Sequence, residues 1–94
     1  MIALLLACTV DPALQLDGDP VPGGQIWSAE CGLCHGQQGQ GTPRGSALVG
    51  VLDRRSPTEV LDTVRFGVST MPSYSNRLDD QDLADLLAWI RTEL

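Results

Sequence analysis

Five consecutive residues, Cys31-Gly-Leu-Cys34-His35, constrain this chain more than any other feature of its sequence. Two cysteines separated by two residues lie on the same side of one helical turn, so their thiols can reach both vinyl groups of a haem. The histidine that follows is then carried beneath the iron, where an imidazole nitrogen can act as an axial ligand. The pentapeptide therefore predicts covalent haem attachment through Cys31 and Cys34, and iron ligation by His35.

Two other uses of paired cysteines were weighed against haem attachment. A thioredoxin-like redox pair belongs in a βαβ surround, and the sequence has no such pattern. A zinc site needs four ligands, whereas this chain has a single histidine and its third cysteine, Cys8, is far from the pair. Haem attachment is the preferred interpretation.

The length and charge of the chain limit its other functions. Its 94 residues, 43% of them apolar, predict one small domain. A chain this short is marginal on its own core, and a covalently bound haem would supply apolar bulk. The net charge of −6 argues against nucleic acid, whose phosphates require Lys and Arg. The acidity fits redox partner proteins with basic docking patches, and equally a merely solvated surface.

The first eight residues predict export and lipidation. Residues 1–7 are apolar and uncharged, and they are far too short to span a bilayer, so they are interpreted as an export signal remnant. Leu5-Leu-Ala-Cys8 resembles the bacterial lipobox, in which the signal is cut before a cysteine that receives lipid. An ordinary signal remnant with an unmodified Cys8 is the alternative. The predicted location is the periplasmic side of a bacterial membrane.

The segment that follows Cys8 has no helical period and is rich in Asp, Pro and Gly. Such a composition is typical of a flexible linker. The predicted organisation is therefore an export signal remnant at 1–7, a lipid-anchored flexible tether at 8–22 and a folded domain at 23–94.

The first predicted helix covers Gly23 to Cys34. Gly23, Trp27 and Cys31 recur every four residues and share one face, where Gly23 would permit close approach of another backbone. Four glycines after the histidine predict a tight loop rather than a phosphate-binding loop, because no strand precedes them and no lysine follows in the required place. The apolar run from Ala47 to Leu52 is predicted to lie over the haem edge.

Two further helices are predicted from their caps. Ser56-Pro57-Thr58-Glu59 is a capping box with proline at the first helical position, and it predicts a helix from Pro57 to Phe66. Asp79 predicts the start of the last helix, Asp80 to Arg91. This helix carries an apolar stripe, flanked by Trp89, that is predicted to be core: Leu83, Leu86, Leu87, Ile90 and Leu94.

Met71 is the only methionine after the start of the chain. A thioether is soft enough to ligate haem iron, and a Met/His pair raises the reduction potential. Pro72 restricts the backbone beside it. Met71 is therefore predicted to be the second axial ligand, although a loop methionine can also simply fill space in a core.

From Gly23 to Leu94 the chain resembles class I cytochrome c, of the mitochondrial and bacterial type. The family pattern Gly-x-x-x-aromatic-x-x-x-Cys matches Gly23, Trp27 and Cys31. In that family the first and last helices cross near a right angle, and the last carries Leu-x-x-aromatic, here Leu86 and Trp89.

The family's methionine also matches, at Met71-Pro72. One segment departs from the family pattern. The family has Pro-x-Leu after the haem histidine, with the proline carbonyl accepting from the imidazole N–H, whereas this chain has Ser46-Ala47-Leu48. Because any residue has a carbonyl, the acceptor for His35 is left open here.

The resemblance implies an all-α class I cytochrome c fold, with three main helices and loops wrapped around one covalent haem c. It implies an electron carrier rather than an enzyme, monomeric, able to attach to an oxidoreductase complex, and binding no nucleic acid. A haem-based gas or redox sensor with a displaceable Met71 is the alternative. A peroxidase ranks last, because no second histidine is present.

Overall fold

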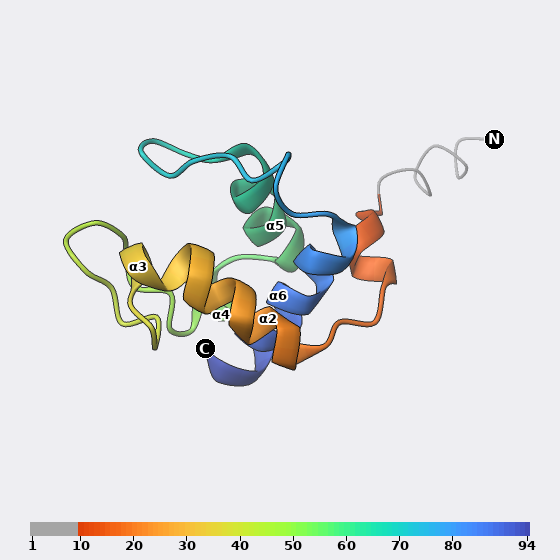
Figure 1. Ribbon diagram of the computed structural model, residues 1–94, viewed down its shortest axis with the longest axis horizontal. Coiled ribbons are helices and arrows are strands. Elements are labelled where there is room, and N and C mark those ends of the chain that lie inside the picture. Colours follow the sequence, from red (N-terminus) through yellow and green to blue (C-terminus); the bar gives the residue numbers. More distant parts are fainter. Residues whose placement is uncertain (1–9) are drawn as a thin grey trace.

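The computed structural model describes residues 10–94 and shows a helical protein (Figure 1). Helix α2 (Pro20–Ile26) continues through a π-helical turn, Trp27–Cys31, into the short α3 (Gly32–His35). Within residues 10–94 there are two isolated β-bridges and no strand. The predicted all-α class is confirmed. The remaining helices are α4 (Val51–Arg54), α5 (Pro57–Phe66) and α6 (Asp80–Glu93).

Helices α2 and α6 cross with their backbones in contact (Figure 1). A Cβ added at Gly23 would collide with the backbone carbonyl of Asp85, so only glycine fits at this position. The predicted close approach at Gly23 is confirmed. The crossing anchors the helix that carries the cysteines against α6.

Local sequence signals account for where the helices begin. Helix α5 has the predicted bounds, and its capping box is complete: the Ser56 backbone N donates to Glu59 Oε1 at 2.8 Å, and Glu59 N donates to Ser56 Oγ at 3.2 Å. Helix α2 begins three residues earlier than expected, because Asp19 accepts from Val21 N at 2.9 Å and caps it.

The segment before α2 differs from the predicted flexible tether over its described part, residues 10–22. A 3₁₀ turn, η1 (Pro12–Gln15), is capped by Asp11 and buries Ala13, which is only 1% exposed. Asp11 also forms a bidentate ion pair with Arg65 of α5, with oxygen–nitrogen distances of 2.5 and 2.6 Å. No local sequence pattern indicates this pair, whose members are 54 residues apart.

Residues 1–9 lie outside the part of the chain that the structure describes. The predicted export signal remnant at 1–7 and the predicted lipid on Cys8 fall in this segment. Among residues 10–94, no helix is both long enough and apolar enough to cross a membrane.

The core is built from α5, α6 and the continuous helix that α2, the π-helical turn and α3 form together, called the first helix below. Four large side chains in it are almost completely enclosed: Trp27, Leu61, Leu83 and Leu86. Trp27 stacks on Trp89 with ring centroids 4.8 Å apart, and its indole N–H donates to the Gln37 carbonyl at 3.0 Å. The predicted stripe of α6 is confirmed as core, with Leu94 at its margin only partly buried.

Candidate haem-binding site

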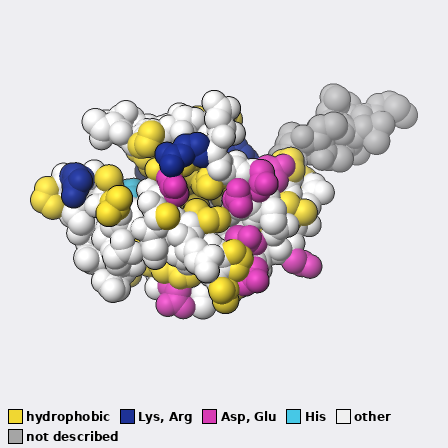
Figure 2. Space-filling view, in the orientation of Figure 1, with side chains coloured by type: hydrophobic (Ala, Val, Ile, Leu, Met, Phe, Trp, Pro, Cys, Tyr) yellow, Lys and Arg dark blue, Asp and Glu magenta, His cyan; other side chains and the backbone are white. Residues whose placement is uncertain are grey.

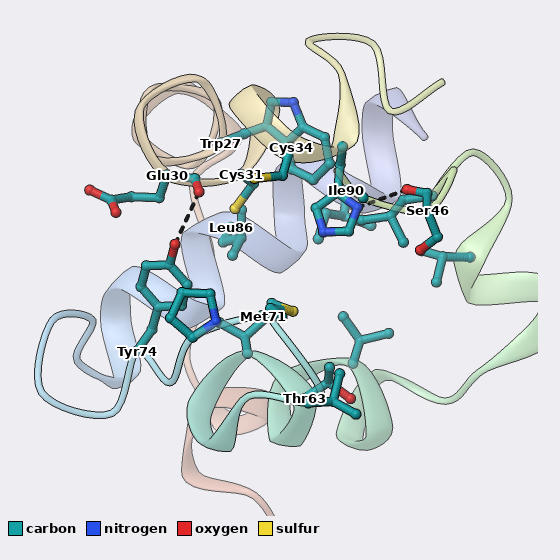
Figure 3. Close-up of a pocket in the computed structure, with 18 of the residues that line it drawn as sticks. Trp27, Glu30, Cys31, Cys34, Ser46, Thr63, Met71, Tyr74, Leu86 and Ile90 are labelled. Carbon is teal, nitrogen blue, oxygen red and sulfur yellow. Dashed lines mark hydrogen bonds between the residues drawn. The ribbon is translucent and has the colours of Figure 1, made fainter. Parts of the chain in front are cut away.

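A cavity of about 450 Å³ opens between the first helix, α5 and the loop that follows α5. Its volume is that of a site for a small molecule or cofactor. The four residues predicted from sequence all line it: Cys31, Cys34, His35 and Met71. Figure 3 shows Met71 across the cavity from Cys31 and Cys34. The structure therefore brings together residues that lie up to 40 positions apart in the sequence (31 to 71).

The two cysteines are free thiols: Cys31, which ends the π-helical turn, is buried, and Cys34, in α3, is exposed. Burial raises the pKa of the Cys31 thiol to about 12, and the nearby Glu30 and Cys34 add to the shift. A thioether carries no charge and suits the apolar surroundings.

His35 is oriented by a backbone carbonyl. Its Nδ1 lies 2.7 Å from the Ser46 carbonyl oxygen, marked by a dashed line in Figure 3. Because a carbonyl only accepts hydrogen bonds, Nδ1 carries the proton and Nε2 keeps its lone pair. This is the tautomer that an axial imidazole ligand needs. The acceptor that the sequence left open is Ser46, the residue in the place of the family's proline.

The glycine-rich loop after His35 packs against the pentapeptide itself. Gly41 N donates to the His35 carbonyl at 2.7 Å, and Thr42 Oγ1 donates to the Cys34 carbonyl at 2.5 Å. A Cβ added at Gly45 would lie 2.7 Å from the Cys34 carbonyl oxygen. The predicted tight loop is confirmed, and its close contact is with the segment that presents the histidine.

Met71 lies in the loop between α5 and α6, at the end of a tight turn. Met71 N donates to the Val68 carbonyl at 2.8 Å, and Val68 N donates back at 3.2 Å. Ser69, within this turn, has a positive φ of 54°. Met71 itself is half-buried. The turn thus presents the methionine side chain on the opposite side of the cavity from the attachment helix.

The cavity lining extends beyond the four predicted residues. The run from Ala47 to Leu52 contributes Leu48 and Val51 to the cavity, as expected, but its end forms α4. Arg44 and Arg55 also line the cavity, as does the buried Tyr74. None of these three residues was singled out from the sequence. The available signal for Tyr74 was its aromatic side chain, only three positions after the predicted ligand Met71.

The cavity fits a covalently attached haem. Two thiols, an imidazole with a free Nε2 and a thioether are the donor set of a c-type haem site, and all four groups border one space. The lining also has a large apolar part, as a porphyrin face requires: Trp27, Leu48, Val51, Val60, Val64, Val68, Pro72, Leu86 and Ile90.

Comparison with known families agrees with this site. Residues 18–90 match the sequence model of a cytochrome family described as cytochrome c oxidase, cbb3-type, subunit III. A cytochrome c-553-like protein of Synechocystis sp. is 36% identical over 97% of this chain and 89% of its own length. The cytochrome c subunit of a quinone alcohol dehydrogenase from Gluconacetobacter polyoxogenes is 31% identical over 77% of this chain, which matches only 18% of that subunit.

Solved structures show the same fold. Cytochrome c6 from the diatom Phaeodactylum tricornutum superposes with a TM-score of 0.64 at 29% identity, covering 80% of this chain and 93% of that one. Cytochrome cL from Hyphomicrobium denitrificans gives a TM-score of 0.68 at 26% identity, covering 87% of this chain and 51% of that one.

The fold and the site together define a small c-type cytochrome. The chain belongs to the class I, single-haem cytochrome c family. It carries one covalently bound c-type haem with iron, and it is an electron carrier that works with redox partners. The predicted family, fold, cofactor and electron-transfer function are confirmed.

Proposed function

We propose that Cys31 and Cys34 hold the haem through thioether bonds, and that His35 and Met71 supply its two axial ligands. The observation that carries this assignment is that all four side chains border one cavity, with Met71 across from the attachment helix. When bound, the haem supplies a one-electron Fe(III)/Fe(II) couple.

The residues around the proposed haem have distinct parts in this function. The Ser46 carbonyl fixes the proton on Nδ1 of His35 and makes the other nitrogen a better ligand. The thioether of Met71 is a neutral, soft ligand that favours Fe(II) and holds the potential up. It also fills the position that a gas or peroxide would need. A carrier, rather than a sensor, follows from a Met71 that stays in place.

The ligation is tested by substituting Met71 in the holoprotein. Wild type should show the weak near-infrared band of sulfur-to-iron charge transfer and bind carbon monoxide poorly when reduced. Met71→Ala should lose the band, fall in potential and admit carbon monoxide. Met71→His should also fall in potential but keep carbon monoxide out. Val68→Ala, in the same turn, is the control and should match wild type. A wild type that lacks the band and binds carbon monoxide rapidly would overturn the assignment.

Covalent attachment is tested at the cysteines. Cys31→Ser and Cys34→Ser should each lose one thioether bond, and the double variant should release all its haem on acid–acetone extraction. Haem that stays attached to the denatured double variant would show that other residues hold it.

The proposed location is the periplasmic side of a bacterial membrane, with Cys8 lipidated and the cytochrome domain at about residues 23–94 carried on residues 8–22. The support is the lipobox-like Leu5-Leu-Ala-Cys8 and the need of a c-type cytochrome for export. The wild-type protein should fractionate with membranes, and Cys8→Ser should release it from the membrane fraction. An unmodified Cys8 in the mass spectrum of the mature protein would contradict lipidation.

A partner with a basic docking patch would meet the carboxylates at the start of α6 rather than the cavity itself. Asp79, Asp80 and Asp82 gather there, and Figure 2 shows acidic side chains toward that end of the visible face. The cavity lining instead carries two arginines, Arg44 and Arg55, against one carboxylate, Glu30. Association with such a partner should weaken as salt is raised.

A further inference from the structure

Tyr74 connects the two sides of the cavity. Its hydroxyl donates to the backbone carbonyl of Glu30 at 3.1 Å, shown by a dashed line in Figure 3. Glu30 directly precedes Cys31 and lies in the π-helical turn of the attachment helix. The ring of Tyr74 is only 7% exposed and lines the cavity. One hydrogen bond therefore links the methionine loop to the segment that carries the first cysteine.

A second contact joins the same two segments. The guanidinium of Arg77 lies 2.8 Å from the Glu30 carboxylate, and its Cζ lies 5.3 Å from the centre of the Tyr74 ring. Because the Arg77 side chain is 58% exposed, this ion pair is weaker than a buried one and depends on salt. Glu30 is thus bound twice by the loop, and the buried contact is the one made by Tyr74.

The backbone of Tyr74 is fixed to α5 as well. Its N–H donates to the Val64 carbonyl at 3.0 Å, and Ser75 N donates to the Arg65 carbonyl at 3.1 Å. Tyr74 therefore marks the point at which the loop after Met71 is held by both neighbouring elements. Only two residues separate it from Met71, so its position limits where the methionine sulfur can lie.

We propose that Tyr74 is the positioning residue for Met71. This inference rests on the proposed ligation by Met71. Its hydroxyl, bound to the Glu30 carbonyl, holds the methionine loop at a fixed distance from Cys31 and so keeps the sulfur at the iron. Moving the loop outward breaks this bond, so opening costs the net free energy of one hydrogen bond. Opening of the loop, which any external ligand requires, is disfavoured accordingly.

The test measures how readily added imidazole displaces Met71 from the ferric holoprotein. Tyr74→Phe removes the hydroxyl and keeps the ring, so the apparent imidazole affinity should rise by about threefold to tenfold, the equivalent of one neutral hydrogen bond. The near-infrared band should remain without imidazole and should disappear at lower imidazole concentration than in wild type. Arg77→Gln should give a smaller rise that vanishes at high salt.

Thr92→Val is the matched control. The Thr92 hydroxyl also donates to a backbone carbonyl, that of Ala88 at 2.9 Å, but this bond lies entirely within α6 and Thr92 is not among the residues that line the cavity. Its imidazole affinity should equal that of wild type. The inference is overturned if Tyr74→Phe binds imidazole like wild type, even with lowered thermal stability, or if the imidazole affinity of Thr92→Val rises equally. A wild type without the near-infrared band would instead refute ligation by Met71.

Discussion

The two walls of the haem cavity are built in different ways. The attachment wall, residues 20–35, is pressed backbone to backbone against α6 at Gly23 and is locked by the Trp27–Trp89 stack. The methionine wall is the loop between α5 and α6, residues 67–79. Where it begins, Phe66 and Val68 are 69% and 60% exposed. It is held mainly by hydrogen bonds to carbonyls rather than by burial of apolar side chains.

This difference matches the bonds that we propose for each wall. Under the proposed ligation, the attachment wall would hold the haem by two covalent bonds and present His35, so it would have no need to move. The methionine wall would offer a single reversible ligand. Local opening draws on the parts of a protein with few buried contacts, and we expect loss of Met71 from the iron to precede unfolding of the rest.

The largest expected effect comes from disrupting the attachment wall. Gly23→Leu should lower the free energy of unfolding by about 3 kcal/mol, because a side chain there must displace the α6 backbone. Thermal denaturation of the holoprotein measures the loss. Gln25→Leu, on the exposed side of the same helix, is the control and should change stability little. Similar melting temperatures for the two variants would contradict a tight crossing.

A smaller effect is expected where the N-terminal segment meets α5. Asp11→Asn should cost about 1.5–3 kcal/mol at neutral pH, since it weakens charged hydrogen bonds to Arg65. The Arg65 guanidinium lowers the pKa of the Asp11 carboxyl below its ordinary value of 3.8. Stability from this pair is therefore fully present above that value and is lost as the pH falls through the lowered pKa.

The difference between Asp11→Asn and wild type should consequently shrink in strong acid, as followed by urea unfolding across the acid range. The near-infrared band of the Asp11→Asn holoprotein should persist, because the ion pair holds residues 10–19 and not Met71. A variant penalty that stays constant down to about pH 2 would argue against the ion pair as its source.

The smallest effect has the opposite sign. Ser69 holds a φ of 54° in the turn before Met71, a conformation that costs a residue with a Cβ about 1 kcal/mol. Ser69→Gly should raise stability by less than that, because glycine also gains freedom in the unfolded chain. Chemical denaturation is the measurement. Thr70→Gly, at a neighbouring residue without a positive φ, should lower stability.

Sequence reasoning succeeded where a signal is local. The bounds of α5 follow from a capping box and a terminal glycine within one stretch of chain. The crossing at Gly23 and the placement of Met71 followed from spacing and from resemblance to a known family. These features could be predicted because neighbouring residues, or a motif, specify them directly.

The features that sequence reasoning missed depend on distant partners. Asp11 and Arg65 are 54 residues apart, and Tyr74 and Glu30 are 44 apart, with nothing in either local pattern to connect them. The acceptor for His35 is a main-chain atom, which every residue has, so the side chain of Ser46 carried no information about it. Such contacts emerge only when the elements are packed.

The π-helical turn has an angular consequence for the first helix. A regular α-helix advances 100° per residue, so the twelve steps from Gly23 to His35 would overshoot three full turns by about 120°. Eleven steps would overshoot by only about 20°. A turn that closes over five residues instead of four absorbs the surplus residue and winds part of this angle back. Surfaces that a helical wheel would draw a third of a circle apart are thereby brought nearer to alignment, so one helix can serve both α6 and the haem.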